Sequence, residues 1–183
     1  MKKLAIDVYY LNDSLARTVG VVFEDWSDQQ PSDIIVDWCH QFGRYIPGQF
    51  YLRELPCILG LLQKVDLRDF DTVILDSYLK LRDDLGTDSP GLGVKLWEVI
   101  GQGYPHLDIW AVAKSKYGKC KQISCPIMRG ESKTPLYVQA LKESNDEAGR
   151  IVRDVMHGPF RLPTLLKILD QVTKKDDECE SDT

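Results

Sequence analysis

The sequence predicts an α/β fold in which a mixed β-sheet is flanked by α-helices. Three strand patterns follow one another at the start of the chain, and helical patterns then alternate with further strands. Grouped strands followed by alternating helices and strands are typical of a mixed sheet covered by helices. The chain has 183 residues, 43% of them hydrophobic, which is enough for one compact domain with a sizeable core.

The first two strands are expected to form a hairpin. Apolar residues alternate with other residues over 4–8, and residues 17–23 are rich in valine. Between them, residues 12–14 read Asn-Asp-Ser, which is turn chemistry. A third apolar stretch, residues 34–36, predicts the third strand of the opening group.

The hydrophobic period becomes helical after Gly48. Apolar residues continue at helical spacing to Leu62, with Pro56 as an expected irregularity, and predict the first long helix. A short β-branched strand over 72–75 then ends at Asp76, and residues 83–90 read as a polar loop.

The second half of the chain predicts two more strands among three helices. We expect a helix over 92–100, strands over 109–113 and 136–139, and closing helices over 146–156 and 163–172. A strand at the amino end and the strand after the first helix are neighbours in many sheets of this order. Acids on these two strands would then be neighbours too.

Domain boundaries follow from composition. Residues 1–175 are predicted to form the single domain, and residues 176–183 a disordered acidic tail with too few apolar residues to pack. The formal net charge is −5, and the five acids of this tail account for all of it. Any basic groove for nucleic acid must therefore come from an uneven distribution of charge over a neutral body.

Cysteine usage and hydropathy bear on the compartment. The five cysteines match no disulfide framework and no zinc-ligand spacing. No apolar stretch approaches 18 residues, and the first residues lead into a strand pattern and not into a signal peptide. We expect a monomer in the reducing cytoplasm, without membrane association.

Three acids are placed by the sequence on separate predicted elements: Asp7 on the first strand, Glu54 on the first helix and Asp76 after the next strand. Acids from separate elements can converge on a divalent cation, as a surface charge run cannot. Each also has a simpler interpretation. Asp7 could be a polar residue near a strand end whose hydrogen bonds are satisfied. Glu54 could pair with Arg53 or Lys64 on a solvated helix face, and Asp76 could cap a turn.

Several short motifs, in order over about 155 residues, are similar to those of the endonuclease V family. They are Asp-Val-x-Tyr from Asp7, Tyr-Ile-Pro-Gly from Tyr45, Arg-Glu-Leu-Pro from Arg53, the strand ending in Asp76, Val-Ala-Lys-Ser from Val112, Pro-Leu-Tyr-Val from Pro135 and Phe-Arg-Leu-Pro from Phe160. The resemblance implies a ribonuclease H-like fold and a nuclease that cuts DNA or RNA near deoxyinosine or inosine.

The resemblance also implies roles for individual residues. Asp7, Glu54 and Asp76 would bind Mg²⁺, for which Mn²⁺ can substitute, and Lys114 would belong to the active site. Without the resemblance, Lys114 reads as an ordinary exposed lysine after an apolar run.

Contacts with nucleic acid are implied for a second group of residues. Tyr45, Ile46 and Pro47 match the family's wedge, which fills the gap left by a flipped base. From the residues alone, Tyr45 and Ile46 could equally form a hydrophobic staple of the following helix. Tyr9 and Arg82 are the other candidates for substrate contacts.

The sequence departs from the family pattern after Asp76. The family has Asp-Gly-His-Gly and then His-Pro-Arg, whereas residues 77–84 lack both glycines and both histidines. Gly-His is also missing after Tyr137-Val138. The alternatives are therefore a non-catalytic or substrate-shifted nucleic-acid-binding protein that has lost inosine recognition, or a nuclease for mismatches or flaps. The choice between DNA and RNA stays open.

Overall fold

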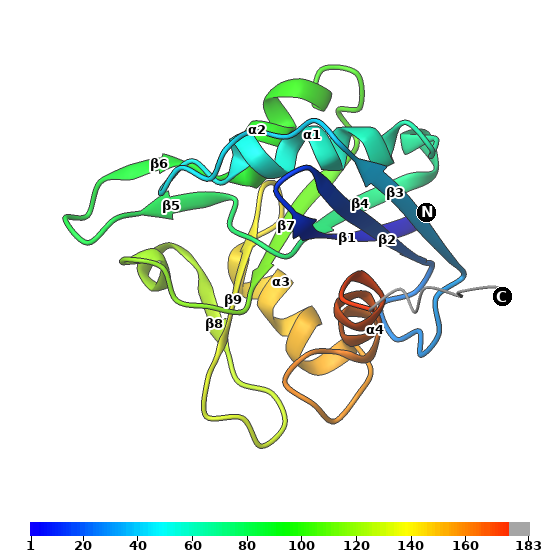
Figure 1. The fold of residues 1–183 in the computed structure, drawn as a ribbon. Coiled ribbons are helices and arrows are strands. Elements are labelled where there is room, and N and C mark those ends of the chain that lie inside the picture. Colours follow the sequence, from blue (N-terminus) through cyan, green and yellow to red (C-terminus); the bar gives the residue numbers. More distant parts are fainter. Residues whose placement is uncertain (176–183) are drawn as a thin grey trace, which may run out of the picture.

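The computed structural model describes residues 1–175, so the predicted acidic tail lies outside the described residues. A seven-stranded mixed sheet has helices on both faces, which confirms the predicted α/β architecture (Figure 1). In spatial order its strands are β3 (Asp33–Cys39), β2 (Leu15–Phe23), β1 (Lys2–Asn12), β4 (Phe70–Leu75), β7 (Asp108–Ala113), β9 (Leu136–Ala140) and β8 (Cys125–Ile127). The helices are α1 (Tyr51–Leu62), α2 (Leu92–Ile100), α3 (Asn145–Arg150) and α4 (Thr164–Thr173).

The middle of the sheet is parallel. β1 pairs with β4, and β4 with β7, in parallel, whereas β2 and β9 run antiparallel to their neighbours β1 and β7. The predicted hairpin of β1 and β2 is confirmed by this pairing. As a result, the carboxyl ends of β1, β4 and β7 lie at the same edge of the sheet.

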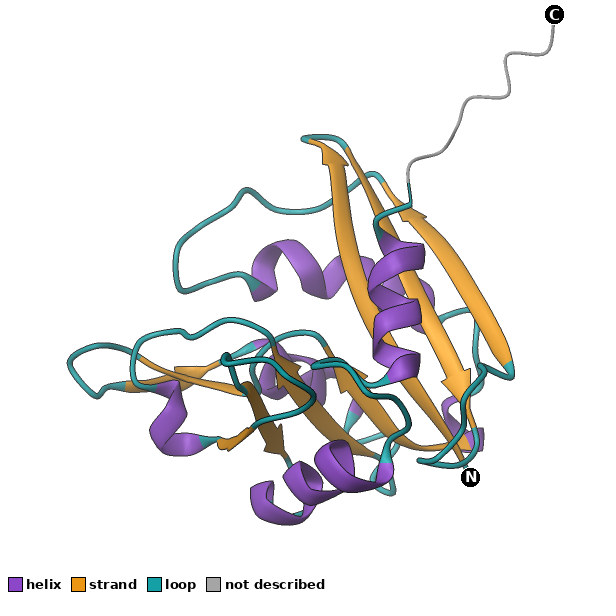
Figure 2. Cartoon of the chain, turned by 90° about the horizontal axis from the view of Figure 1, so that it is seen from below, coloured by secondary structure: helices purple, strands orange, loops and turns teal. Residues whose placement is uncertain are grey.

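Each face of the sheet carries its own core. Leu4 and Ile6 of β1 point toward α1 and α2, while Ala5 points toward α3 and α4. This alternation follows from the two-residue period of a strand. Figure 2 shows α4 lying along the strands of the β1–β2 side.

Two segments differ from the sequence prediction. The expected polar loop over 83–90 contains a strand, β6 (Asp88–Pro90), which pairs with the preceding β5 (Lys80–Arg82) in a hairpin. In the turn of this hairpin the Asp83 carboxylate accepts from two backbone N–H groups. Arg82 and Asp88 form an ion pair across it. The helix expected over 146–156 is α only to Arg150 and π-helical over Ile151–Val155.

Shorter elements complete the chain. β8 has three residues and was not predicted, since three residues carry no measurable alternation. 3₁₀ turns occur at Leu67–Asp69 and Cys120–Ile123. Within residues 1–175, no helix is both long and apolar enough to cross a membrane.

Candidate metal centre

The two-residue repeat of the strands places three site residues on one face of the sheet, at one edge. Ala5 of β1, Ile74 of β4 and Val112 of β7 all belong to the core beneath α4. Each of these residues is followed, two positions later in the sequence, by a site residue: Asp7, Asp76 and Lys114. Since side chains two apart share a face, all three point toward the α4 side, where the strands end.

Strand pairing fixes the spacing of the first two acids. Ile6 of β1 is the register partner of Leu75 of β4. The backbone N–H of Asp76 donates to the Ile6 carbonyl over 3.4 Å, which continues the pairing by one residue. Asp7 and Asp76 are therefore neighbours, as expected from the sequence.

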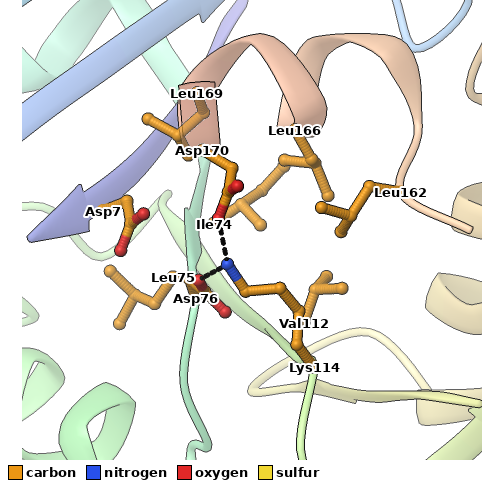
Figure 3. Close-up of a pocket in the computed structure, with 10 residues that line it drawn as sticks. All are labelled: Asp7, Ile74, Leu75, Asp76, Val112, Lys114, Leu162, Leu166, Leu169 and Asp170. Carbon is orange, nitrogen blue, oxygen red and sulfur yellow. Dashed lines mark hydrogen bonds and ion pairs between the residues drawn. The ribbon is translucent and has the colours of Figure 1, made fainter. Parts of the chain in front are cut away.

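Asp170 on α4 is a site residue that the sequence interpretation missed. Carboxylate oxygens of Asp7, Asp76 and Asp170 all lie within 4.8 Å of one another (Figure 3). The sequence does contain a signal, because Asp170 follows Leu169 and lies four residues after Leu166. Both leucines are buried against the sheet, so an acid beside them on the same helix face is directed inward.

Lys114 lies among these acids. Its Nζ is 2.5 Å from an Asp76 oxygen and 2.6 Å from an Asp170 oxygen. Lys174, the first residue after α4, also pairs with Asp170 over 2.6 Å. The pKa of the Lys114 ammonium is raised: burial opposes its charge, but Asp76 and Asp170 more than compensate.

Burial raises the pKa values of the two strand acids, Asp7 and Asp76. Burial, and to a smaller extent the Asp76 charge, raise the pKa of Asp7 to about 7, and the Lys114 ammonium only partly opposes this. The pKa of Asp76 is raised as well, mainly by burial. At Asp170 burial acts in the same direction, but hydrogen bonds from Lys114 and Lys174 lower the pKa overall.

Glu54 approaches from the opposite layer. It lies in the first turn of α1, the helix that packs on the Leu4 and Ile6 face of β1. Burial, together with the charges of Asp7 and Asp76, raises the pKa of Glu54 to about 8. Glu54 is thus close enough to interact with both strand acids, although it is outside the group within 4.8 Å.

The donor set suits a hard divalent cation. Carboxylate oxygens are the ligands that Mg²⁺ and Mn²⁺ prefer, and the four acids come from β1, α1, the end of β4 and α4. A cation among them would relieve the repulsion that raises the pKa values of Asp7 and Glu54. The adjoining cavity, of about 20 Å³, is lined by Asp7, Asp76 and Asp170 together with Lys114 and apolar side chains of β4, β7, α4 and the loop before α4.

The predicted substrate-contacting residues lie outside this cavity. Tyr45 and Ile46 are 56% and 42% exposed, on the segment before α1 that also contains the exposed Pro47. Tyr9 is exposed two residues beyond Asp7. The Arg82 guanidinium is paired with Asp88, its Nε 2.5 Å from a carboxylate oxygen, so its charge is already balanced within the hairpin.

The segment after Asp76 is packed, where the endonuclease V pattern would place glycines. Tyr78 and Leu79 are 7% and 2% exposed, and the Tyr78 hydroxyl donates to the Ser115 carbonyl over 2.7 Å. The buried Gln139 side chain accepts from the N–H groups of Leu79 and Lys80 and donates to the Lys80 carbonyl. This loop is therefore fixed to the sheet by side chains that fill its interior.

Comparison with known proteins supports the fold. No protein-family model matches the sequence, and no curated protein sequence matches it either. Among solved structures, Ciona intestinalis endonuclease V in complex with a DNA containing an inosine is similar, with a TM-score of 0.69 and 17% identity over 94% of this chain and 84% of that chain. Human ENDOV gives a TM-score of 0.66 and 18% identity, covering 94% and 82% of the two chains.

Streptomyces avermitilis endonuclease V gives a TM-score of 0.66 and 16% identity, covering 94% of this chain and 79% of that chain. The expected ribonuclease H-like fold of endonuclease V type is thereby confirmed. The identities are low, and the chain is a divergent example of this fold.

Proposed function

We propose that this protein is a divalent-metal-dependent endonuclease of endonuclease V type, which hydrolyses phosphodiester bonds in DNA or RNA. The observation that carries the proposal is the meeting of Asp7, Asp76 and Asp170 within 4.8 Å, beside Lys114, at the carboxyl edge of the sheet. The fold and the donor set support it together.

In this proposal the acids hold Mg²⁺ or Mn²⁺. Asp7 and Asp76 supply oxygens from the strands, Asp170 from α4 and Glu54 from α1. When bound, such a cation lowers the pKa of a coordinated water and neutralises charge on the scissile phosphate.

Lys114 has a separate role. Its Nζ contacts Asp76 and Asp170, and its pKa is raised, so it remains an ammonium at neutral pH. From this position it reduces repulsion among the acids and is available to donate a hydrogen bond to a phosphate oxygen.

A cleavage assay tests the proposal. Labelled single- and double-stranded DNA and RNA, with and without inosine, are incubated with the protein and Mn²⁺, and the products are separated on a denaturing gel. We expect cleavage that EDTA abolishes and that Asp7→Asn lowers at least a hundredfold, since the variant loses a charged ligand. Asp13→Asn, on the exposed turn between β1 and β2, is the matched control and should cut like the wild type. Full activity in Asp7→Asn would exclude this site.

One observation favours the substrate-shifted alternative. Tyr78 and Leu79 fill the segment where the resemblance implies a glycine-lined pocket for hypoxanthine, and Arg82 is engaged by Asp88. On this alternative the metal centre remains and inosine recognition is lost. Equal cleavage of matched strands with inosine and with guanosine would support it. A preference for inosine of tenfold or more would argue against it.

A further inference from the structure

Two cysteines meet between the edge strand β3 and the helix α1. Cys39 is the last residue of β3 and is partly exposed, whereas Cys57 lies within α1 and is fully buried. Both are free thiols, and a hydrogen bond joins the Cys57 side chain to that of Cys39. The proposed nuclease chemistry uses neither of them.

The strand period places Cys39 on the face of the sheet that α1 covers. Ile35 of β3 packs against the core beneath α1 and α2. Cys39 comes four residues later on the same strand, and side chains an even number of residues apart share a face of the sheet. The Cys39 side chain is therefore on the α1 side.

Contacts on the same strand bring α1 close to this end of β3. Lys64, just after α1, pairs with Asp37 over 2.8 Å. Gly60 of α1 lies against the same acid, since a Cβ there would be 2.7 Å from an Asp37 carboxylate oxygen. Cys39 follows Asp37 by two residues, and Cys57 precedes Gly60 by about one helical turn. The packing that holds α1 on β3 thus also brings the two thiols together.

A bond between these sulfurs would enclose residues 40–56. This loop contains the whole connection from β3 to α1, and residues 40–50 of it form neither helix nor strand. It also contains Glu54, in the first turn of α1. A cross-link across such a loop removes conformational freedom from the unfolded chain. The bond would fasten the start of α1, with Glu54, to the edge of the sheet.

The two thiols differ in their access to oxidants. Cys39 is partly exposed, so a small oxidant in solvent reaches it first. Burial and the hydrogen bond with Cys39 raise the pKa of the Cys57 thiol, which stays protonated inside the fold. An accessible cysteine with a second cysteine beside it is the usual arrangement of redox-sensitive thiols. In a reducing compartment the disulfides of such pairs are transient.

We propose that Cys39 and Cys57 form a reversible modification site, in which oxidation by hydrogen peroxide creates a disulfide that joins β3 to α1. The Cys39 sulfur, as the thiolate, attacks one peroxide oxygen, and the O–O bond breaks to give a sulfenic acid and one water. The Cys57 sulfur loses its proton and attacks the Cys39 sulfur, and the sulfenic oxygen leaves as a second water. The two thiols lose two electrons, which the peroxide gains, and a thiol reductant reverses the change. This inference is independent of the proposed nuclease function.

Peptide mapping of the full chain tests the bond directly. The reduced protein is treated with hydrogen peroxide, its remaining thiols are alkylated, and the monomeric fraction is digested with trypsin without reductant. Trypsin cleaves after lysine and arginine, so Cys39 and Cys57 fall on separate peptides, residues 18–44 and 54–64. We expect mass spectrometry to find these two peptides as one disulfide-linked species that reduction separates.

Thermal unfolding measures the effect of the bond on the fold. For a loop of this length, the Tm of the peroxide-treated protein should be roughly 4–12 °C above that of the reduced protein, and a thiol reductant should abolish the difference. Cys39→Ser and Cys57→Ala should each lose both the linked peptides and the rise in Tm. Cys125→Ser removes another partly exposed thiol, and this matched control should respond to peroxide like the wild type.

The outcomes are distinct. Linked peptides 18–44 and 54–64 with a reversible rise in Tm would support the proposal, whether or not the protein cleaves nucleic acid. A wild-type Cys39 that is oxidised only to sulfenic or sulfinic acid would overturn it. Peptide 18–44 joined instead to peptide 176–183, which contains Cys179, would also overturn it. A linked product whose Tm is no higher than that of the reduced protein would refute the stabilising role of the bond.

Discussion

The pH dependence of stability in the metal-free protein is a direct test of the crowded acids, and Glu54→Gln is the informative variant. Burial and the charges of Asp7 and Asp76 raise the pKa of Glu54 to about 8, whereas its ordinary value is 4.5. Between these values the folded protein retains a proton that the unfolded chain has lost. The free energy of unfolding therefore falls as pH rises through this window.

The magnitude follows from the size of the shift. One proton held only by the folded state changes the free energy of unfolding by about 1.4 kcal/mol per pH unit. From pH 6 to pH 8, Glu54 alone should lower the stability of the metal-free protein by roughly 2 kcal/mol. Asp7, with a pKa of about 7, adds to this decline. Glu54→Gln cannot ionise, so the variant should lack the part that Glu54 contributes.

Thermal unfolding followed by circular dichroism, in EDTA with a reducing agent, measures the difference. In a chain of 183 residues, 1 kcal/mol corresponds to about 2–4 °C in Tm. The Tm of Glu54→Gln relative to the wild type should therefore rise by about 4–8 °C between pH 6 and pH 8. Glu98→Gln, an exposed acid on α2, is the control and should track the wild type. Parallel Tm curves for the wild type and Glu54→Gln would refute the electrostatic reasoning.

Three further predictions concern other parts of the site. Asp170→Asn should weaken Mn²⁺ binding about tenfold or more in calorimetry, because one of the three close carboxylates is lost; unchanged affinity would remove Asp170 from the centre. Lys114→Met should lower the Tm in EDTA at pH 8, because Asp76 loses its ion-pair partner and Asp170 keeps only Lys174, and Mn²⁺ should restore it. A Tm equal to that of the wild type in EDTA would contradict the ion-pair assignment. Arg129→Met should lower the free energy of unfolding, measured in urea, by about 3–5 kcal/mol. The reason is that the buried guanidinium donates to carbonyls of residues 153–161, on the segment leading to α4. A loss below about 1 kcal/mol would contradict that role.

The sequence predicted the strands and helices with clear periodicity. Alternation identified β1, and the helical spacing of leucines identified α1 and α4, because both patterns repeat over several turns or pleats. The β5–β6 hairpin was not predicted. Its strands have three residues each, and it depends on contacts such as Arg82 with Asp88 that come together only in the fold.

The site was predicted in part for a similar reason. Asp7 lies within one strand that the sequence shows plainly, Asp76 directly follows another, and the parallel pairing of β1 with β4 makes them neighbours. The leucine spacing of α4 indicates that Asp170 faces the sheet, but its approach to Asp7 and Asp76 depends on how α4 crosses the sheet, which the sequence does not show. The ion pairs of Lys114 likewise involve two acids that are distant from it in sequence, Asp76 and Asp170, so they could be recognised only in three dimensions.

The central claim is that the acids of β1, α1, the end of β4 and α4 bind one divalent centre. Anomalous diffraction from a crystal soaked in Mn²⁺ tests it most directly. We expect an anomalous peak bounded by the carboxylates of Asp7, Asp76 and Asp170, absent from crystals of Asp7→Asn prepared in the same way. A wild-type crystal with Mn²⁺ bound elsewhere and no peak between these carboxylates would contradict the account.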